Sequence, residues 1–260
     1  MRSLIERHGG VATVAASMRE VPLEDNHEAF AFAEQLFAGR FDLVIFMTGV
    51  GARGLLEVLE TRYPREQFFE ALARCEIIVR GPKPASVLRE WKVPFQHQVP
   101  EPNTWRELLT LLDEKSPVAG RSVAIQEYGK PNEELYAALR ERGAEVHPVQ
   151  VYRWALPEET GPLEEAIRST IAGDFDVLLF TSANQLTNVL DVAERLGCRD
   201  EWLAAARRCV IASIGPTASE TLEAAGLPVD LVPEHPKMGH LIREAAAAAH
   251  RLLDKKRAAQ

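Results

Sequence analysis

The sequence predicts an α/β protein of two similar domains, each a parallel sheet flanked by helices, joined by two crossing strands. Short apolar runs that suit buried parallel strands alternate with amphipathic stretches of helical length. The pattern also occurs twice, because Phe-Asp-Leu-Val-Ile-Phe at 41–46 returns as Phe-Asp-Val-Leu-Leu-Phe at 175–180, and 175 − 41 = 134. Solenoid units span about 20–50 residues, so this longer period indicates two domain-sized copies.

The elements follow from the apolar runs and the turns between them. Strands are expected over 12–17, 43–47, 76–80, 123–127, 146–151, 177–181, 209–214 and 229–232. Amphipathic stretches predict helices over 51–59, 85–91, 133–142, 185–196 and 218–225. Glycine and proline mark the turns between these elements.

The repeat predicts that the first copy lacks its opening strand. Residues 4–11 match residues 139–146 at an offset of 146 − 11 = 135. By that offset the counterpart of the strand at 123–127 would begin at 123 − 135 = −12. We therefore expect a chain shortened at its N-terminus.

Two proline-containing segments at matched places, 18–25 and 153–159, are expected to cross between the domains. The first complete α/β domain is then predicted to span 23–152. The second joins 1–22 to 153–260 and is discontinuous, without its first strand.

Composition excludes several classes of protein. A net charge of −8 argues against a nucleic-acid partner, which needs a basic face. No apolar run reaches the roughly 18–20 residues of a membrane helix, and no signal peptide opens the chain. The cysteines, at 75, 198 and 209, lack paired spacing, which argues against disulfides or a zinc site and favours a cytoplasmic location. The basic residues at 255–257 suggest a solvated helix end.

Catalytic motifs are absent, so the turns after strands are the candidate sites. Small residues there open helices whose first N–H groups favour carboxylate or phosphate. The first matched pair of turns comprises Thr48, Gly49 and Val50 in one copy, and Ser182, Ala183 and Asn184 in the other. The alternative is simple helix capping by Thr48 and Ser182.

A second matched pair of turns carries Gly-Pro. It comprises Arg80 and Lys83 in one copy, and Gly215, Pro216 and Thr217 in the other, with Thr217 as a predicted cap. The alternative here is helix initiation only. Tyr128, Lys130 and Lys237 lie in further turns and could contact a polar ligand, or belong to plain polar loops.

Tyr152 is the candidate catalytic residue. It ends the strand at 146–151 and starts the second crossing, which places it at the predicted domain junction. A buried phenol can donate one proton. The matching residue in the first copy is Ser17, so the repeat does not require a phenol. The alternative is an interface aromatic with a polar tip.

Together these motifs resemble the uroporphyrinogen-III synthase family. The resemblance rests on Phe-Thr-Ser-Ala-Asn at 180–184, on Ala-Ser-Ile-Gly-Pro-Thr-Ala at 212–218 with Leu222 and Gly226, and on Val-Gln-Val-Tyr-Arg at 149–153. It covers nearly the whole chain. This chain departs from the family's pattern at two of these turns. Gln-Glu stands at 126–127 where Arg-Gly is frequent, and Thr-Gly-Val-Gly stands at 48–51 where the family's turn usually contains Ser or Asn.

The resemblance implies two α/β domains with the substrate between them. It implies an enzyme of heme biosynthesis that closes the linear tetrapyrrole hydroxymethylbilane into uroporphyrinogen III, with inversion of ring D and loss of water. It also implies no cofactor or metal, Tyr152 as the acid, and the turns at 48–50, 182–184 and 215–217 as binders of acetate and propionate groups. The alternative is a non-catalytic two-domain sensor of a small anionic ligand or tetrapyrrole. The oligomeric state stays open.

Overall fold

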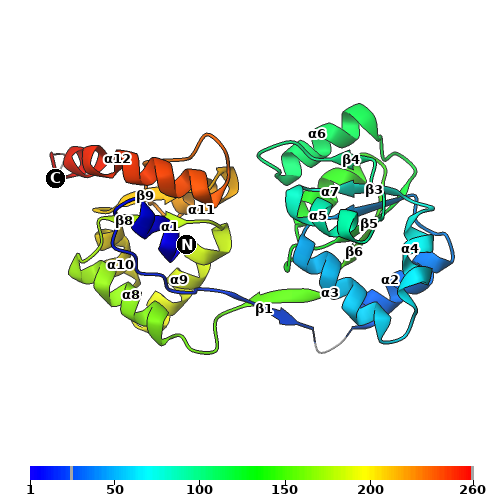
Figure 1. Ribbon diagram of the computed structural model, residues 1–260, viewed down its shortest axis with the longest axis horizontal. Helices are drawn as coiled ribbons and strands as arrows, with labels where there is room; N and C mark the ends of the chain where they lie inside the picture. Colours follow the sequence, from blue (N-terminus) through cyan, green and yellow to red (C-terminus); the bar gives the residue numbers. More distant parts are fainter. Residues whose placement is uncertain (24–25, 259–260) are drawn as a thin grey trace. The chain divides into compact units, whose positions relative to one another are not determined.

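The computed structural model describes residues 1–23 and 26–258, which divide into two compact units (Figure 1). Unit 1 comprises Met1–Arg19 and Ala155–Gln260, and unit 2 comprises Glu20–Trp154. The chain passes between the units at β1 (Arg19–Pro22) and β7 (Tyr152–Ala155), which pair in a two-stranded sheet. Residues 24 and 25 of the first predicted crossing lie outside the described residues.

Unit 2 contains a five-stranded parallel sheet in the order β4-β3-β2-β5-β6. Its strands are β2 (Leu43–Phe46), β3 (Glu76–Val79), β4 (His97–Gln98), β5 (Ser122–Gln126) and β6 (Glu145–Val149). The chain adds β3 and β4 on one side of β2 and then β5 and β6 on the other. The topological switch point therefore lies between β2 and β5, where open α/β sheets place their ligands.

Both faces of this sheet are covered by helices, as the unbroken apolar run of β2 predicts. Val44 and Phe46 pack on one face with α2 (His27–Phe37), α3 (Gly49–Glu60), α4 (Arg65–Leu72) and α5 (Pro82–Glu90). Leu43 and Ile45 pack on the other face with α6 (Trp105–Lys115) and α7 (Glu133–Glu141). The alternation follows from the two-residue period of a strand, so every residue of β2 is buried.

Unit 1 has a smaller parallel sheet, formed by β8 (Val177–Phe180) and β9 (Val210–Ser213). Phe180 and Ile211 belong to the main core of this unit. The helices of unit 1 are α1 (Arg2–Arg7), α8 (Gly161–Ala172), α9 (Ala183–Arg195), α10 (Arg199–Ala206), α11 (Pro216–Ala224) and α12 (Met238–Ala258). Ala212 of β9 packs with Leu241 and Ala245 of α12.

Two predicted strands of unit 1 are wrong. Residues 12–17 form no strand, and no described sheet includes them. The segment 229–232 makes one isolated bridge, from Leu231 to Ala212. The predicted solvated end of α12 is also wrong for Lys256, whose side chain is 12% exposed and pairs with Asp230 at 2.7 Å.

Matching contacts show that the two units are built alike. The Cys75 thiol lies 3.2 Å from the Phe41 carbonyl oxygen, and the Cys209 thiol lies 3.1 Å from the Phe175 carbonyl oxygen. Both pairs are separated by the 134-residue offset, since 209 − 75 and 175 − 41 are equal. Burial raises the pKa of both thiols, which disfavours the reactive thiolate form.

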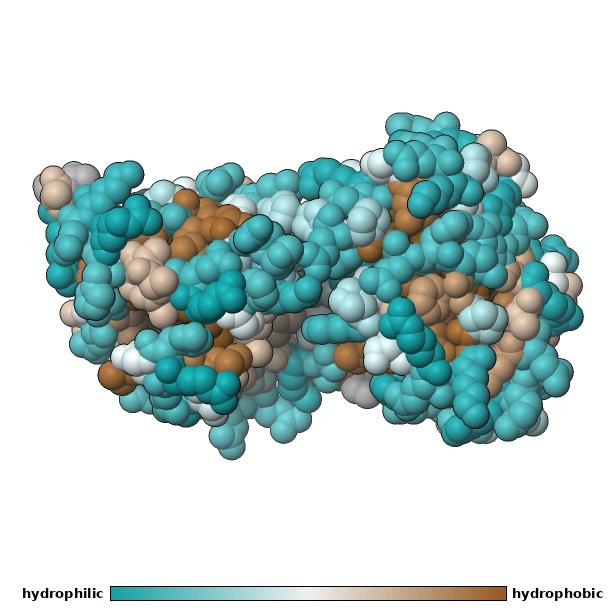
Figure 2. All heavy atoms as spheres, turned by 45° about the horizontal axis from the view of Figure 1, so that its top comes forward, coloured by the Kyte–Doolittle hydropathy of each residue, from teal (hydrophilic) through white to brown (hydrophobic). Residues whose placement is uncertain are grey.

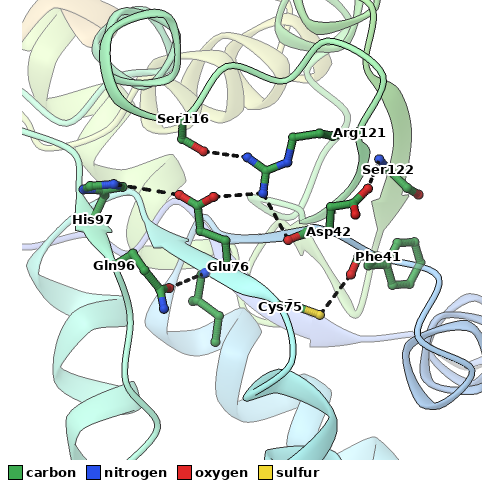
Figure 3. Close-up of polar contacts among 10 residues, drawn as sticks. Phe41, Asp42, Cys75, Glu76, Gln96, His97, Ser116, Arg121 and Ser122 are labelled. Atoms are coloured by element: carbon green, nitrogen blue, oxygen red, sulfur yellow. Dashed lines mark hydrogen bonds and ion pairs between the residues drawn. The ribbon is translucent and has the colours of Figure 1, made fainter.

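A polar network closes the amino end of the unit 2 sheet (Figure 3). Arg121 donates to Glu76 at 2.8 Å and to the Ser116 hydroxyl at 2.8 Å. Asp42 accepts the Ser122 N–H at 2.8 Å and so ties the start of β2 to the start of β5. This network lies at the end of the sheet opposite the switch point's ligand edge, and its role is therefore structural.

The surface is mainly hydrophilic on the face drawn in Figure 2, with apolar side chains reaching it in patches. The large apolar side chains that are exposed in the described part are Val11, Val14, Val50, Leu196, Val232 and Met238. Within residues 1–23 and 26–258, no helix is both long enough and apolar enough to span a bilayer.

Candidate functional site at the carboxyl edge of the parallel sheet

Thr48 follows β2 at the switch point and caps α3. Its hydroxyl accepts the Gly51 N–H at 2.9 Å, which confirms the predicted cap. Its own N–H donates to the side-chain oxygen of Gln126, the last residue of β5, at 3.1 Å. Gln126 is 1% exposed, and its amide nitrogen donates to the Glu127 carbonyl. The ends of β2 and β5 are therefore joined by side-chain hydrogen bonds at this edge.

Tyr152 reaches the same edge from β7. Its phenolic oxygen lies 3.2 Å from the Thr48 hydroxyl oxygen, and its side chain is buried, at 5% exposure. Burial raises the pKa of Tyr152 to about 12, against which the Thr48 hydrogen bond works in the opposite direction. The phenol is neutral at physiological pH, as a tyrosine of ordinary pKa, about 10, also is. It carries a hydroxyl proton, and the raised pKa makes it a weaker acid.

Two further aromatic rings support Tyr152. The Trp154 ring stands edge-on to the Tyr152 ring, with centroids 5.5 Å apart at 87°. The Trp154 indole N–H donates to the Tyr128 carbonyl at 3.0 Å. Gly129 makes this packing possible, because a Cβ there would lie 2.7 Å from the Tyr152 ring and 2.8 Å from the Trp154 nitrogen. Its φ of +69° also favours glycine.

Arg80 lies beside these rings. Its guanidinium carbon is 4.7 Å from the centroid of the Tyr128 ring. Arg80 is half-buried, and burial lowers its pKa. Across the described residues no ion pair reaches this guanidinium. A cation in this setting favours an incoming carboxylate, since the ligand would supply the missing charge.

A second buried polar pair lies behind β5. The Tyr136 hydroxyl donates to the Glu127 carboxylate at 2.5 Å, and Glu127 is 4% exposed. Burial raises the pKa of both groups, although the Tyr136 hydrogen bond partly opposes the shift of Glu127. Ionising Glu127 therefore costs free energy in the folded protein. Glu127 directly follows Gln126, whose side chain contacts Thr48 in the candidate site.

In unit 1, the turn after β8 differs from its counterpart in unit 2. Ser182 is the N-cap residue of α9, as the capping alternative expected, but its side chain makes no capping bond. The Gln185 side chain instead accepts the Thr181 N–H at 2.7 Å. Asn184 is 7% exposed, and its amide nitrogen has no hydrogen-bond partner among the described residues. Ala183 is half-buried beside it.

The Gly-Pro turns begin α5 and α11, as predicted. Pro82 and Pro216 are the first residues of these helices. Gly215 is the residue that precedes α11, and Thr217 is the second residue inside it, so Thr217 is not the cap that we predicted. The Ser219 hydroxyl donates to the Gly215 carbonyl at 3.0 Å and so lies across the first turn of the helix.

The structure brings together part of the predicted set. Thr48 contacts Tyr152, and Arg80 contacts Tyr128, all within unit 2. The exposed predicted residues are Val50, Lys83, Lys130, Pro216, Thr217 and Lys237, whereas Gly49 and Gly215 are buried. The expectation that the turns of the two units share one cleft stays a prediction.

Sequence reasoning missed Gln126, Trp154 and Gly129. Gln126 carried a signal, since it is a polar residue at the end of an apolar strand. Trp154 also carried a signal, because it lies two residues after Tyr152, and side chains two apart on an extended strand lie on the same side. Gly129 gave none beyond its place in a turn. The described residues contain no group of three or more histidine, cysteine, aspartate or glutamate side chains placed to hold a metal ion.

Fold and site together define a two-unit α/β protein with helix starts at the carboxyl edges of its parallel sheets. In unit 2, the Tyr152 phenol from β7 contacts Thr48 at that edge, and the Arg80 guanidinium follows β3 there. The family model described as uroporphyrinogen-III synthase HemD matches residues 1–243. The chain therefore belongs to the uroporphyrinogen-III synthase family.

Individual relatives and solved structures are similar over most of their length. The protein YjjA of Bacillus subtilis (strain 168) is 29% identical over 248 residues, which cover 94% of this chain and 89% of YjjA. Among solved structures, a mutant uroporphyrinogen III synthase from the extremely thermophilic bacterium Thermus thermophilus is similar with a TM-score of 0.69 and 25% identity, over 98% and 94% of the two chains. The Helicobacter pylori 26695 enzyme, at 19% identity and a TM-score of 0.55 over 88% and 89%, shares the fold.

Proposed function

We propose that this protein is a uroporphyrinogen-III synthase that closes hydroxymethylbilane into uroporphyrinogen III, inverting ring D and releasing water. The observation that carries the proposal is the buried, neutral phenol of Tyr152, held 3.2 Å from the Thr48 hydroxyl at the carboxyl edge of the sheet. A protein that only bound an anionic ligand would not require a proton donor at this place.

Tyr152 acts on the hydroxymethyl group of the substrate. The pyrrole nitrogen lone pair expels the hydroxyl as its carbon–oxygen bond breaks, and Tyr152 gives the departing oxygen a proton, so that water leaves. For ring D to invert, the bond between that ring and its bridging methylene breaks and re-forms at the ring's other α-carbon. The final closure releases a proton from this carbon as the pyrrole regains its aromaticity, and the proton returns to the phenolate. The atoms balance without an added reactant, and the acid is regenerated in each turnover.

Thr48 prepares the phenol for this role. Its oxygen already accepts the Gly51 N–H, so its own proton is available for the Tyr152 oxygen. When Thr48 donates in this way, the Tyr152 proton is free to point toward the substrate. Thr48 is therefore a positioning residue in this proposal, rather than only a contact for the substrate.

The carboxylates of the substrate are bound by Arg80 and by helix starts. The first N–H groups of α3, at Gly49 and Val50, lack intrahelical partners, as do those of α9 at Ala183 and Asn184. Oriented N–H groups of this kind favour anions. Because the azafulvene cation of such a pyrrole forms readily, most of the catalytic task is to hold a folded conformation of the substrate.

A product assay tests the proposal. Purified protein is given hydroxymethylbilane, and isomers III and I are separated, with a protein-free sample to measure spontaneous closure. We expect isomer III to dominate. Saturable binding of the tetrapyrrole with a product mixture equal to that of the protein-free sample would instead favour the sensor.

A further inference from the structure

Gln126 binds the two residues that follow β2, one through its main chain and one through its side chain. Its carbonyl oxygen accepts the Met47 N–H at 3.3 Å. The next N–H of the chain, at Thr48, donates to its side-chain oxygen at 3.1 Å. The side chain of Gln126 therefore extends the contact between β2 and β5 to the residue whose hydroxyl meets the Tyr152 phenol.

Both ends of the Gln126 amide are engaged. The amide nitrogen donates to the Glu127 carbonyl, while the amide oxygen accepts the Thr48 N–H. The residue is 1% exposed, so bulk water cannot replace these bonds. An amide turned by half a rotation would set its oxygen against the carbonyl oxygen and its nitrogen against the N–H, which leaves buried polar groups unpaired. The amide thus has one orientation, and it fixes the main chain of Thr48.

Gly51 leaves the space that this amide occupies. A Cβ at residue 51 would overlap the Gln126 amide and lie 2.7 Å from its oxygen. The Gly51 N–H also donates to the Thr48 hydroxyl at 2.9 Å. One residue in the first turn of α3 therefore orients the Thr48 hydroxyl and admits the amide that holds the Thr48 main chain.

The matching turn of unit 1 shows the same backbone without such an amide. Ser182 matches Thr48, since 182 − 48 = 134, and its φ and ψ of −162° and 145° are close to the −143° and 150° of Thr48. The Ser182 side chain nevertheless makes no capping bond. The nearby Gln185 side chain binds the N–H of Thr181, one residue earlier. An extended backbone and a hydroxyl are therefore not sufficient to produce the capping orientation of Thr48.

We propose that Gln126 is a positioning residue of the synthase reaction, which holds Thr48 so that its hydroxyl accepts the Gly51 N–H and meets the Tyr152 phenol. This inference rests on the proposed function, since Tyr152 is the acid of that reaction. In the described part of the chain, no hydrogen bond joins Gln126 to the phenol itself. Its influence on proton transfer therefore passes through Thr48.

A double-mutant cycle tests this coupling. Gln126→Met keeps the length of the side chain and removes both hydrogen bonds. In the otherwise wild-type chain, the rate of isomer III formation should fall about tenfold, as for one buried hydrogen bond, and the fraction of isomer I should rise. The Tyr152→Phe chain has no phenolic proton to position, so the same substitution there should change the rate by less than about twofold.

Gly51→Ala displaces the amide without removing it. The added methyl group occupies the place of the Gln126 amide, while alanine favours a helix more than glycine does. The product ratio should shift toward isomer I as in Gln126→Met, and the two substitutions together should do no more than either alone. The control is Gln96→Met, because the Gln96 side chain accepts the Ile77 N–H at 2.7 Å near the amino end of β3. It loses the same kind of bond and should keep the wild-type product ratio.

The outcomes separate positioning from a structural role. A loss of equal size in the wild-type and Tyr152→Phe backgrounds overturns the proposal, and so does an unchanged product ratio in Gln126→Met. A wild-type protein that forms no excess of isomer III refutes the proposed function, and the positioning is then tested by carbon-13 NMR. The signal of the oxygen-bearing ring carbon of Tyr152, identified by its loss in Tyr152→Phe, should shift in Gln126→Met and not in Gln96→Met. No shift in Gln126→Met overturns the proposal.

Discussion

Thr48 and Tyr152 lie 104 residues apart in the sequence, yet their hydroxyl oxygens are 3.2 Å apart. The contact joins the cap of α3 to the strand β7, through which the chain leaves unit 2. One hydroxyl thus serves both the start of a helix and the orientation of a phenol. The expected effects of substitutions at this edge follow from that double use.

Tyr152→Phe should slow formation of isomer III while leaving folding nearly intact. The ring retains its packing against Trp154, and only the phenolic proton is lost. General acid catalysis is typically worth about 10²–10⁴-fold, and we expect the lower end because the hydroxyl leaves an electron-rich pyrrole readily. Spontaneous closure to isomer I then competes, so the product ratio is the sensitive measurement. An unchanged rate and ratio would remove Tyr152 from the mechanism.

Thr48→Val should lower the fraction of isomer III and also destabilise the protein. Loss of the cap costs about 0.5–2 kcal/mol, and the phenol loses its partner. Thr48→Ser keeps a hydroxyl and should restore both properties. The matched control is Thr104→Val at the cap of α6, which should lose similar stability without altering the product ratio. The same product ratio in both valine variants would contradict the positioning role.

Arg80→Gln should raise the KM for hydroxymethylbilane more than it lowers kcat. The substitution removes the positive charge that we assign to substrate carboxylates but leaves Tyr152 in place. We expect a change in KM of about tenfold, in keeping with one charged hydrogen bond of roughly 1.5–3 kcal/mol. Lys130→Gln removes an exposed charge from a neighbouring turn and is the control. Equal effects of the two substitutions would indicate general electrostatic attraction only.

Gly129→Ala should disturb the aromatic rings and lower stability more than a glycine substitution elsewhere. The matched control is Gly39→Ala, because both glycines have φ of +69° and only Gly129 has neighbours in the way. The control should cost about 1–2 kcal/mol of backbone strain. Gly129→Ala should lose a further amount of about 1–3 kcal/mol from crowding. Urea unfolding measures both, and equal losses would refute the steric role of Gly129.

The change that Glu127→Gln makes in the free energy of unfolding should be more favourable at pH 8 than at pH 4. Burial raises the pKa of Glu127 in the folded state, so the unfolded chain releases this proton at lower pH than the folded chain does. Stability is therefore lost as pH rises from the ordinary glutamate value, about 4.3, through the folded value. Glutamine cannot ionise and avoids this loss.

Urea unfolding at the two pH values measures the effect, with the exposed Glu114→Gln as control. A stability difference between wild type and Glu127→Gln that is the same at both pH values would show that the ionisation of Glu127 is not costly.

Central strands were predictable because their signal is local. The run at 43–47 is apolar throughout, as a strand flanked on both sides requires. Residues 12–17 carry the same kind of run, but a strand also needs a neighbour to pair with, and none is present beside them in the described part of the chain. The apolar pattern of one segment describes only its own side chains and does not show whether a neighbouring strand is present.

The candidate site was predictable only where one residue type indicated the chemistry. Tyr152 and Thr48 were identified separately, but their contact depends on how β7 meets the end of β2. Gln126 and Lys256 were misjudged or missed because burial of a polar side chain depends on partners distant in sequence, such as Asp230 for Lys256.

The division of the chain between the units has a consequence for its synthesis. Unit 2 is continuous, from Glu20 to Trp154, whereas unit 1 needs residues 1–19 together with residues 155–260. A ribosome adds about 5–20 residues per second, so the first segment waits roughly 5–20 s for the last 260 − 154 = 106 residues to be made. During that interval the residues of the first segment that pack on the unit 1 core, such as Ala15, have no native partners, while unit 2 can already fold. Chaperone dependence in the cell should therefore arise from the first nineteen residues, and a circular permutant that begins at residue 155 would remove the delay.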